Sequence, residues 1–195
     1  MTRTRIEPLV PPYAPDVQET LRRLMPEGME PIALFRTVAH NPRVLQRLQR
    51  GGLLDRGSIS LRQREIAILR TTALLGAEYE WGVHIAAFGD AAKLTPAERH
   101  ATVHGTAGDE VWADDERLIL RLVDALHAQG TIDDALFQAL AAHFTSAQLV
   151  ELSMLAGLYH AVSFIVNVSG VAPELWAARW TRPNSSAVAA HSTGE

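Results

Sequence analysis

Along most of the chain, hydrophobic positions recur at helical spacing, and signals that start and stop helices follow one another closely. The clearest amphipathic helix is predicted over Asp114–Gln129. Its first turn is acidic, Leu118, Leu122 and Leu126 share one face, and Gly130 follows its last turn. No run of alternating hydrophobic and polar residues has the length of a convincing strand. The pattern therefore predicts an all-α protein.

Further helix starts are marked by capping patterns, in which a hydroxyl residue precedes a glutamine or glutamate by three positions. Asn41 before Pro42 predicts another start, and Gly51 a stop soon after it. The capping patterns are Ser60 with Gln63, Thr95 with Glu98, and Thr145 with Gln148.

The stretch from Ala147 to Val168 differs because its apolar residues cover all sides of the predicted helix. Its length would permit a membrane span, but Glu151, His160 and Asn167 interrupt it and no basic flank orients it. We therefore expect a buried central helix and no membrane association. His160 and Asn167 lie on nearly one face and are candidate substrate-binding residues, although each could instead satisfy a buried partner or a subunit contact.

The chain divides into three parts by composition. Residues 1–15 hold four of the ten prolines and predict an extended arm. We expect residues 16–181 to form a single domain, and residues 182–195, which are small and polar, to form a flexible tail. The first residues contain no apolar run typical of a secretion signal, so we expect a cytoplasmic protein.

Charge and cysteine content exclude several classes of function. The 195 residues carry a net charge of −4 with no basic block, so nucleic acid is not an expected partner. The sequence has no Cys, which excludes disulfides, thiolate metal sites and thiol nucleophiles. No phosphate-binding glycine loop or serine nucleophile motif is present either.

Residues 61–99 contain the richest set of chemical groups. One helix is expected to end near Gly76 and a second to begin soon after it, so the two should pack as a hairpin. Glu65 falls on the same stripe as the apolar Leu61 and Leu69. A carboxylate on a buried face is costly without a partner, and a nearby histidine could share a proton with it.

The second helix of the hairpin supplies that histidine. Glu80 and His84 are four residues apart and point the same way, with Tyr79 and Trp81 beside them. One interpretation is a proton-transfer cluster of Glu65, Glu80 and His84, with the two aromatic residues shaping a substrate pocket. The other is an ordinary Glu/His pair on a helix surface.

A metal site is a further possibility, because Glu65, Glu80 and His84 offer oxygen and nitrogen ligands. The sequence has one pair of histidines at helical spacing, His100 and His104. The glycines just after that pair break the helix, so we discount it. Only one of the three candidate ligands is a histidine, so we expect no bound metal ion.

The segment from Arg64 to His84, which ends in YEWGVH, resembles the carboxymuconolactone decarboxylase family. Residues 148–174 are similar to the closing helix of that family, with Glu151, Tyr159 and Asn167 at its landmarks. The resemblance covers residues 30–178. It implies an AhpD-like helical bundle in which a helical hairpin carries the site.

The AhpD-like alkylhydroperoxidases of this family carry a glutamate, a Cys-x-x-Cys pair and then a histidine. Glu65 and His84 match the glutamate and the histidine, but Ala77 and Glu80 stand at the two cysteine positions. Thiol-dependent peroxide reduction is therefore excluded. The resemblance points to the cysteine-free, decarboxylase-like branch, which uses no cofactor and assembles into homo-oligomeric rings such as trimers or hexamers.

The resemblance implies a cofactor-free carbon–carbon lyase acting on a small lactone or a related carbonyl compound, within aromatic degradation. In our hypothesis His84 donates the proton, Glu65 fixes and tunes it, and Glu80 positions the substrate or relays the proton. No motif identifies an arginine that would clamp an anionic substrate, and Glu80 would repel one. A neutral lactone or ketone therefore stays open as the substrate. Two other functions also stay open, a metal-dependent hydrolase or oxygenase and a non-catalytic oligomeric binding protein.

Overall fold

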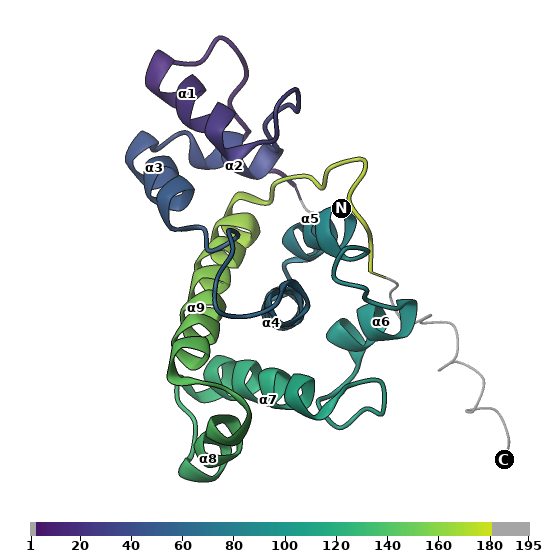
Figure 1. Ribbon diagram of the computed structural model, residues 1–195. Helices are drawn as coiled ribbons and strands as arrows, with labels where there is room; N and C mark the ends of the chain where they lie inside the picture. The colour runs from purple at the N-terminus through teal and green to yellow at the C-terminus, as the bar shows by residue number, and fades with distance from the viewer. Residues whose placement is uncertain (1–2, 181–195) are drawn as a thin grey trace, which may run out of the picture.

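The structure, a computed structural model, describes residues 3–180, and the predicted tail at 182–195 lies outside them. Within that range the regular elements are all helices, which confirms the predicted fold class (Figure 1). The helices in chain order are α1 (Pro15–Leu24), α2 (Ala33–Val38), α3 (Pro42–Gly51), α4 (Leu61–Leu74), α5 (Glu78–Phe88), α6 (Pro96–His104), α7 (Asp114–Gln129), α8 (Asp134–His143) and α9 (Ser146–Ser169).

Helix α4 occupies the centre of the bundle. Figure 1 shows it nearly end-on, with α5, α6, α7 and α9 around it, and it packs against all four. Every residue from Arg64 to Thr72 is buried, including the two arginines and the glutamate in that run. Because apolar and polar residues alike face neighbouring helices, α4 carries ionisable groups into the core.

The predicted capping patterns are confirmed. In each capping box the hydroxyl accepts the backbone N–H three residues later, and the side chain of that later residue accepts the N–H of the cap. At α3 the Asn41 side chain accepts the N–H of Val44, and at the end of α7 Gly130 has the left-handed φ of 70°. The three boxes are Ser60–Gln63, Thr95–Glu98 and Thr145–Gln148.

The N-terminal part of the chain forms a small lobe beside the bundle. Helices α1, α2 and α3 lie together at the top of Figure 1 and have their own apolar cluster, which includes Leu21, Leu34 and Leu45. The cluster continues onto Val83 of α5 and Val162 of α9. The lobe is therefore packed onto the end of the bundle that holds these two residues.

Of the predicted arm, residues 3–14 are described; they form no helix or strand, and α1 begins at Pro15. This segment contacts the end of α9 in the same chain. The backbone N–H groups of Arg5 and Ile6 both donate to the carbonyl of Ser169, at 2.7 and 3.2 Å. That carbonyl belongs to the last turn of α9 and would otherwise lack a helical partner.

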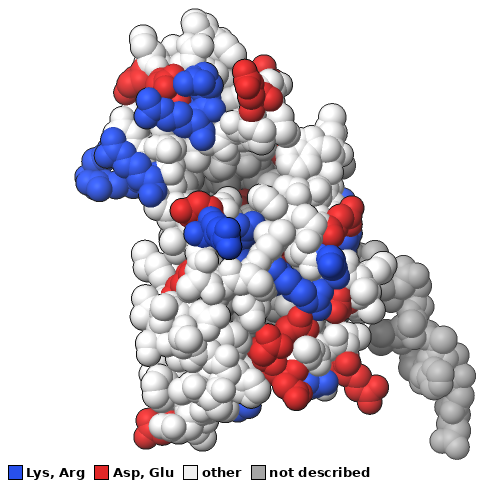
Figure 2. Space-filling view, in the orientation of Figure 1, with Lys and Arg blue, Asp and Glu red and all other residues white. Residues whose placement is uncertain are grey.

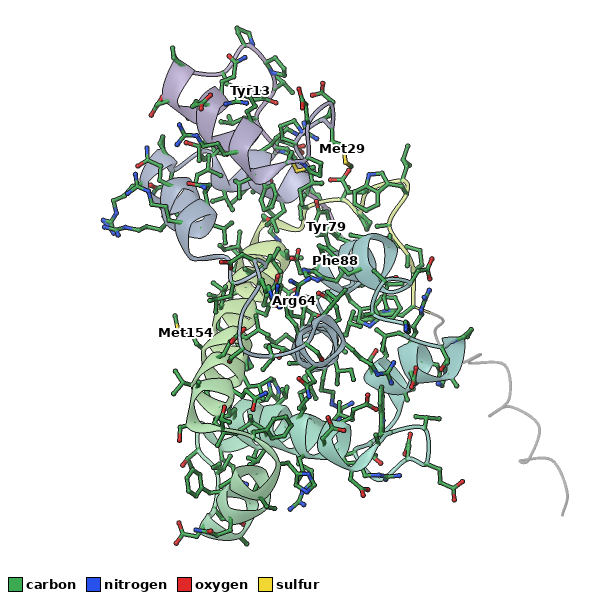
Figure 3. The ribbon with its side chains drawn as sticks, viewed as in Figure 1. Tyr13, Met29, Arg64, Tyr79, Phe88 and Met154 are labelled. Carbon is green, nitrogen blue, oxygen red and sulfur yellow. The ribbon has the colours of Figure 1, made fainter. Side chains whose placement is uncertain are left out.

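Helix α9 is long and apolar enough to cross a membrane by length and composition, but it packs against α4 and α7 in this fold. Only 39% of its most apolar window is buried, so it is not enclosed on all sides as the sequence suggested. An apolar stripe faces outward, and Figure 3 shows Met154 pointing away from the bundle. The exposed positions are Ala147, Val150, Met154, Gly157, Ala161, Phe164 and Val168, and we call them the α9 stripe.

Candidate active site

Glu65 and His84 are in contact in the core. Helix α4 carries Glu65 and α5 carries His84, and the tight turn at Gly76, which has a φ of 67°, joins the two helices. His84 Nδ1 lies 2.7 Å from Glu65 Oε2, and neither side chain has more than 3% of its surface exposed. The short distance and the burial together fix the orientation of the imidazole ring.

Arg64 holds the other oxygen of the glutamate. Its Nε and Nη2 atoms lie 2.9 and 2.8 Å from Glu65 Oε1, and its Nη1 donates to the carbonyl of Leu54 at 2.6 Å. The guanidinium carbon lies 5.0 Å from the ring centre of Phe88, and Figure 3 places the two side chains together. Both oxygens of Glu65 are therefore occupied, one by Arg64 and one by His84.

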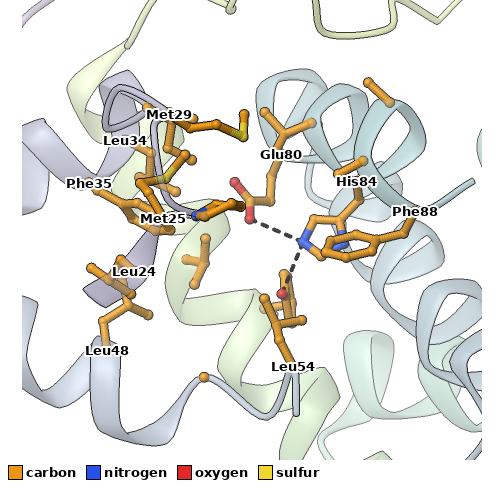
Figure 4. A pocket seen from close by; sticks show the side chains of 18 of the residues that line it. Leu24, Met25, Met29, Leu34, Phe35, Leu48, Leu54, Glu80, His84 and Phe88 are labelled. Atoms are coloured by element: carbon orange, nitrogen blue, oxygen red, sulfur yellow. Dashed lines mark hydrogen bonds and ion pairs between the residues drawn. The ribbon is translucent and has the colours of Figure 1, made fainter. Parts of the chain in front are cut away.

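The second nitrogen of His84 faces two other groups. Nε2 lies 3.0 Å from the Tyr159 hydroxyl and 3.5 Å from Glu80 Oε1, as the dashed lines in Figure 4 show. Tyr159 comes from α9 and is buried, with its ring edge-on to the imidazole. In the sequence it stood out only as a landmark of the family resemblance, since nothing in the residue pattern places it beside His84.

Burial by itself lowers the pKa of His84, but its hydrogen bonds to Glu65 and Glu80 and their charges outweigh this and raise the pKa to about 9. The imidazole is therefore a cation at neutral pH, with one N–H donated to Glu65. Burial also raises the pKa of Tyr159 well above its ordinary value, so its hydroxyl keeps its proton. The site at neutral pH holds an imidazolium next to a neutral phenol.

The raised pKa of His84 predicts a loss of stability in alkaline solution. A group whose pKa is higher in the folded state stabilises the fold fully below its ordinary value of 6.5, and the contribution disappears as the pH rises through about 9. We expect the free energy of unfolding in urea to fall by about 3 kcal/mol across that window. The His84→Gln variant should show a much flatter profile. A wild-type profile no steeper than that of the variant would contradict the raised pKa.

Glu80 is buried without a complete set of partners. One carboxylate oxygen faces His84, but Oε2 is shielded from solvent and has no hydrogen-bond partner in the structure. Figure 4 shows the carboxylate between the imidazole of His84 and the side chains of Met25 and Met29. A buried carboxylate oxygen without a donor is costly, so this atom is the natural attachment point for a ligand.

A cavity of about 470 Å³ adjoins these groups, between the N-terminal lobe and the bundle. Its volume lies within the range of small-molecule sites. Its ionisable side chains are those of Glu80, His84 and Tyr159, and Trp176 adds an indole N–H to the lining. The wall opposite the ionisable groups comes from α1, α2, α3, the loops between them and the loop that follows α3, and includes Met25, Leu34, Phe35, Leu48 and Leu54.

The two aromatic residues expected to shape the pocket lie elsewhere. The Tyr79 hydroxyl donates to Glu174 at 2.8 Å and accepts the N–H of Leu34 at 3.0 Å. Trp81 points toward α6, where its Nε1 donates to the Thr102 hydroxyl at 2.9 Å. Neither residue lines the cavity beside His84. They flank Glu80 in sequence, so the helix turns them to either side of it.

His160 and Asn167 do not reach the cavity either. His160 Nδ1 lies 2.8 Å from the carbonyl of Ala156, and its Nε2 lies 3.2 Å from His127 on α7. The amide of Asn167 is exposed and donates to the carbonyl of Leu75 at the end of α4, at 2.7 Å. Both residues therefore make structural contacts, as the second interpretation of the sequence allowed.

A metal site would need a different arrangement of these carboxylates. Among residues 3–180 no group of three His, Asp or Glu side chains is placed to hold a metal ion. Glu65 has no oxygen to offer, because Arg64 and His84 occupy both of them. The metal alternative therefore loses one of the three ligands it relied on.

No protein-family model and no curated protein matches the sequence. Solved structures do. A peroxidase-related protein from Silicibacter sp. TM1040 matches with a TM-score of 0.75 and 14% identity, over 90% of this chain and 95% of that one. An uncharacterized peroxidase-related protein from Ralstonia eutropha JMP134, described as an alkylhydroperoxidase AhpD core, matches with a TM-score of 0.73 and 17% identity, over 88% of this chain and 94% of that one. The debrominase Bmp8 matches with a TM-score of 0.69 and 15% identity, over 90% and 95%.

These likenesses show that the chain has the AhpD-like fold, as the resemblance at Arg64–His84 implied. One of the similar proteins, the debrominase Bmp8, is an enzyme, so the fold is one that supports catalysis. At this level of identity the likeness does not carry an activity over. The present chain has no Cys, and its site instead presents two glutamates, a histidine and a tyrosine.

Proposed function

We propose that the protein is a cofactor-free enzyme that transfers a proton to or from carbon in a small, uncharged carbonyl compound. One observation carries the proposal: His84 is fixed by Glu65 through one nitrogen and presents the other to an apolar cavity. A buried, oriented imidazolium of this kind is an effective proton donor. An acid at that position typically contributes about 10² to 10⁴-fold to the rate.

In this proposal the groups of the site act either as proton donors or as a proton acceptor. The imidazolium N–H and the Tyr159 hydroxyl stabilise the oxygen of an enolate and deliver a proton. Glu80 supplies a carboxylate on the same wall, which accepts a proton or a hydrogen bond from the substrate. Glu65 and Arg64 do not line the cavity and act as positioning residues for His84.

The lining favours an uncharged lactone or enolisable ketone over carboxymuconolactone. No Lys or Arg is among the residues that line the cavity in the described part of the chain, so nothing there offers a substrate carboxylate a cation other than His84. The carboxylate of Glu80 opposes a second negative charge in the same small space. Isomerisation, or carbon–carbon cleavage through an enolate, therefore fits the site better than loss of carbon dioxide from a dicarboxylate.

The experiment that tests the proposal is proton NMR in heavy water with uncarboxylated lactones, simple enolisable ketones and carboxymuconolactone. Site-specific deuterium uptake at carbon, or a rearranged product, supports proton transfer. The absence of both with every compound overturns the proposal, and tight binding without reaction would identify a binding protein instead. Elemental analysis of untagged protein checks the metal alternative, which requires a stoichiometric ion whose removal abolishes activity.

We also propose that the protein assembles into homo-oligomers through the α9 stripe. The stripe follows the alternating four- and three-residue spacing of a helix–helix seam and includes Val150, Met154, Phe164 and Val168 as exposed large side chains. Figure 2 shows few charges over the area that α9 occupies in Figure 1. A contiguous exposed apolar strip on a soluble domain typically marks an interface.

Light scattering should therefore give a mass that is a multiple of 21.3 kDa at micromolar concentration. Met154→Glu places a charge in the middle of the stripe and should shift the mass to that of the monomer. Val10→Glu changes an equally exposed apolar residue outside α9 and should leave the mass unchanged. A monomeric wild-type protein would refute the interface.

A further inference from the structure

The cavity is almost wholly apolar and has room for more than a small ring. Apolar and aromatic residues form all of it except the wall with Glu80, His84 and Tyr159, and the indole N–H of Trp176 is the one further polar side-chain group in the lining. Met29, Leu54 and Trp176 line it and are themselves partly exposed, so its mouth is apolar as well. Flexible methionines at such a site adapt to the shape of a hydrophobic ligand. The ligand therefore has a substantial uncharged, hydrophobic body.

The polar wall lacks one hydrogen-bond donor. Glu80 Oε2 is buried and unpaired, while His84 Nε2 is already shared between Tyr159 and the other oxygen of the same carboxylate. No lining side chain donates to Oε2 in the structure, and this includes Trp176, whose indole N–H is the one other side-chain donor in the lining besides His84 and Tyr159. Buried carboxylate oxygens are normally paired, so the missing donor is one that a ligand brings.

The same wall also offers donors. The His84 imidazole and the Tyr159 hydroxyl lie 3.0 Å apart, and Glu80 Oε1 lies 3.5 Å from the same imidazole nitrogen. An acceptor for a hydroxyl and a donor for a carbonyl thus stand side by side. A molecule that carries these two groups on neighbouring carbons can engage both at once.

We infer that the cavity binds an uncharged, hydrophobic hydroxy-carbonyl compound, such as an acyloin, whose hydroxyl donates to Glu80 and whose carbonyl accepts from His84 or Tyr159. The inference rests on the proposed function for the role of the carbonyl. The hydroxyl preference stands independently on the unpaired oxygen of Glu80. An amine could also donate to Glu80, but its positive charge would face the imidazolium of His84 across the same wall.

Calorimetric titration with matched probes tests the ligand class without any need for turnover. The probes are butyroin, its methyl ether, the corresponding ketone without the hydroxyl, octanoate and octylammonium. Butyroin should bind at least about tenfold more tightly than its methyl ether, because only butyroin can donate to a buried carboxylate. Equal binding of butyroin and its ether, stronger binding of either ion, or no binding of any probe at millimolar concentration overturns the inference.

Two variants on the same helix locate the effect. Glu80→Leu removes the acceptor, so butyroin and its ether should bind with equal affinity. Glu78→Leu is the matched control, because Glu78 lies two residues away and pairs with Arg179 outside the cavity. It should keep the wild-type preference. If Glu80→Leu does not fold, the comparison of butyroin with its ether on the wild-type protein still decides the inference.

The outcomes also separate this inference from the proposed function. A hydroxyl preference that depends on Glu80, without deuterium uptake from any compound, would leave the ligand class standing and overturn proton transfer. Deuterium uptake into simple lactones or ketones, with no preference for butyroin over its ether, would support proton transfer and overturn the ligand class.

Discussion

Replacing His84 with glutamine is expected to lower the rate of deuterium uptake at carbon by about 10² to 10⁴-fold, the usual contribution of a positioned general acid. Glutamine keeps a side-chain amide that can contact Glu65, but the amide does not titrate near neutral pH and cannot act as a general acid. The rate should be measured by proton NMR in heavy water on the best substrate found, with far-UV circular dichroism to show that the variant folds.

His160→Gln is the matched control for this substitution. His160 makes its contacts with the Ala156 carbonyl and with His127, away from the cavity, so its loss should leave the exchange rate unchanged. Tyr159→Phe removes a hydroxyl that contacts the imidazole and should cause an intermediate loss. Exchange at the wild-type rate in a folded His84→Gln protein would show that the proton comes from another group.

The order and ends of the helices could be predicted from the sequence because their signals are local. A capping box such as Ser60 with Gln63 satisfies backbone donors within one turn of a helix, so residues three apart are enough to locate it. The relative positions of the helices depend on packing. The sequence therefore suggested that the apolar Ala147–Val168 stretch is the central helix, whereas α4 takes that place. α4 has fewer apolar residues, but its charged side chains pair inside the core.

The sequence placed Glu65 and His84 on the two helices of one hairpin, but it left open whether they touch, and the structure shows the contact. The role of Arg64 could not be predicted. A neighbour in sequence points about 100° away on a helix, yet the long Arg64 side chain folds back onto Glu65. The cavity wall opposite the hairpin comes from residues 24–54, which precede the hairpin, and no local pattern links the two segments.

The error at Tyr79 and Trp81 has a geometric cause. Glu80 and His84 define the face of α5 that meets the cavity, and Val83 completes it at helical spacing. Residues directly before and after Glu80 point about 100° to either side of that face. Tyr79 therefore meets Glu174 and Trp81 meets Thr102, although both are near the site in sequence.

Replacing Glu65 with glutamine is expected to destabilise the protein by about 3 kcal/mol or more, since it removes the one negative charge between two buried cations. Arg64 and His84 each keep a hydrogen-bond donor aimed at the position, but the amide offers only one oxygen for both. The NH₂ group of the glutamine then faces an N–H group of either Arg64 or His84 at close range. The pKa of His84 should fall with the loss of this partner. The free energy of unfolding of the variant should therefore depend less on pH in alkaline solution.

Urea unfolding at neutral pH measures the effect, and the chain offers a control with the same chemistry at the surface. Glu19 also pairs with two arginines, Arg22 at 3.0 Å and Arg23 at 2.9 Å, but in an exposed position. Water can solvate all three groups after substitution, so Glu19→Gln should change the stability little or not at all. If the two substitutions cost the same, burial of Glu65 between Arg64 and His84 does not set its importance. A much larger cost at Glu65 would show that the site depends on a charge that solvent cannot replace.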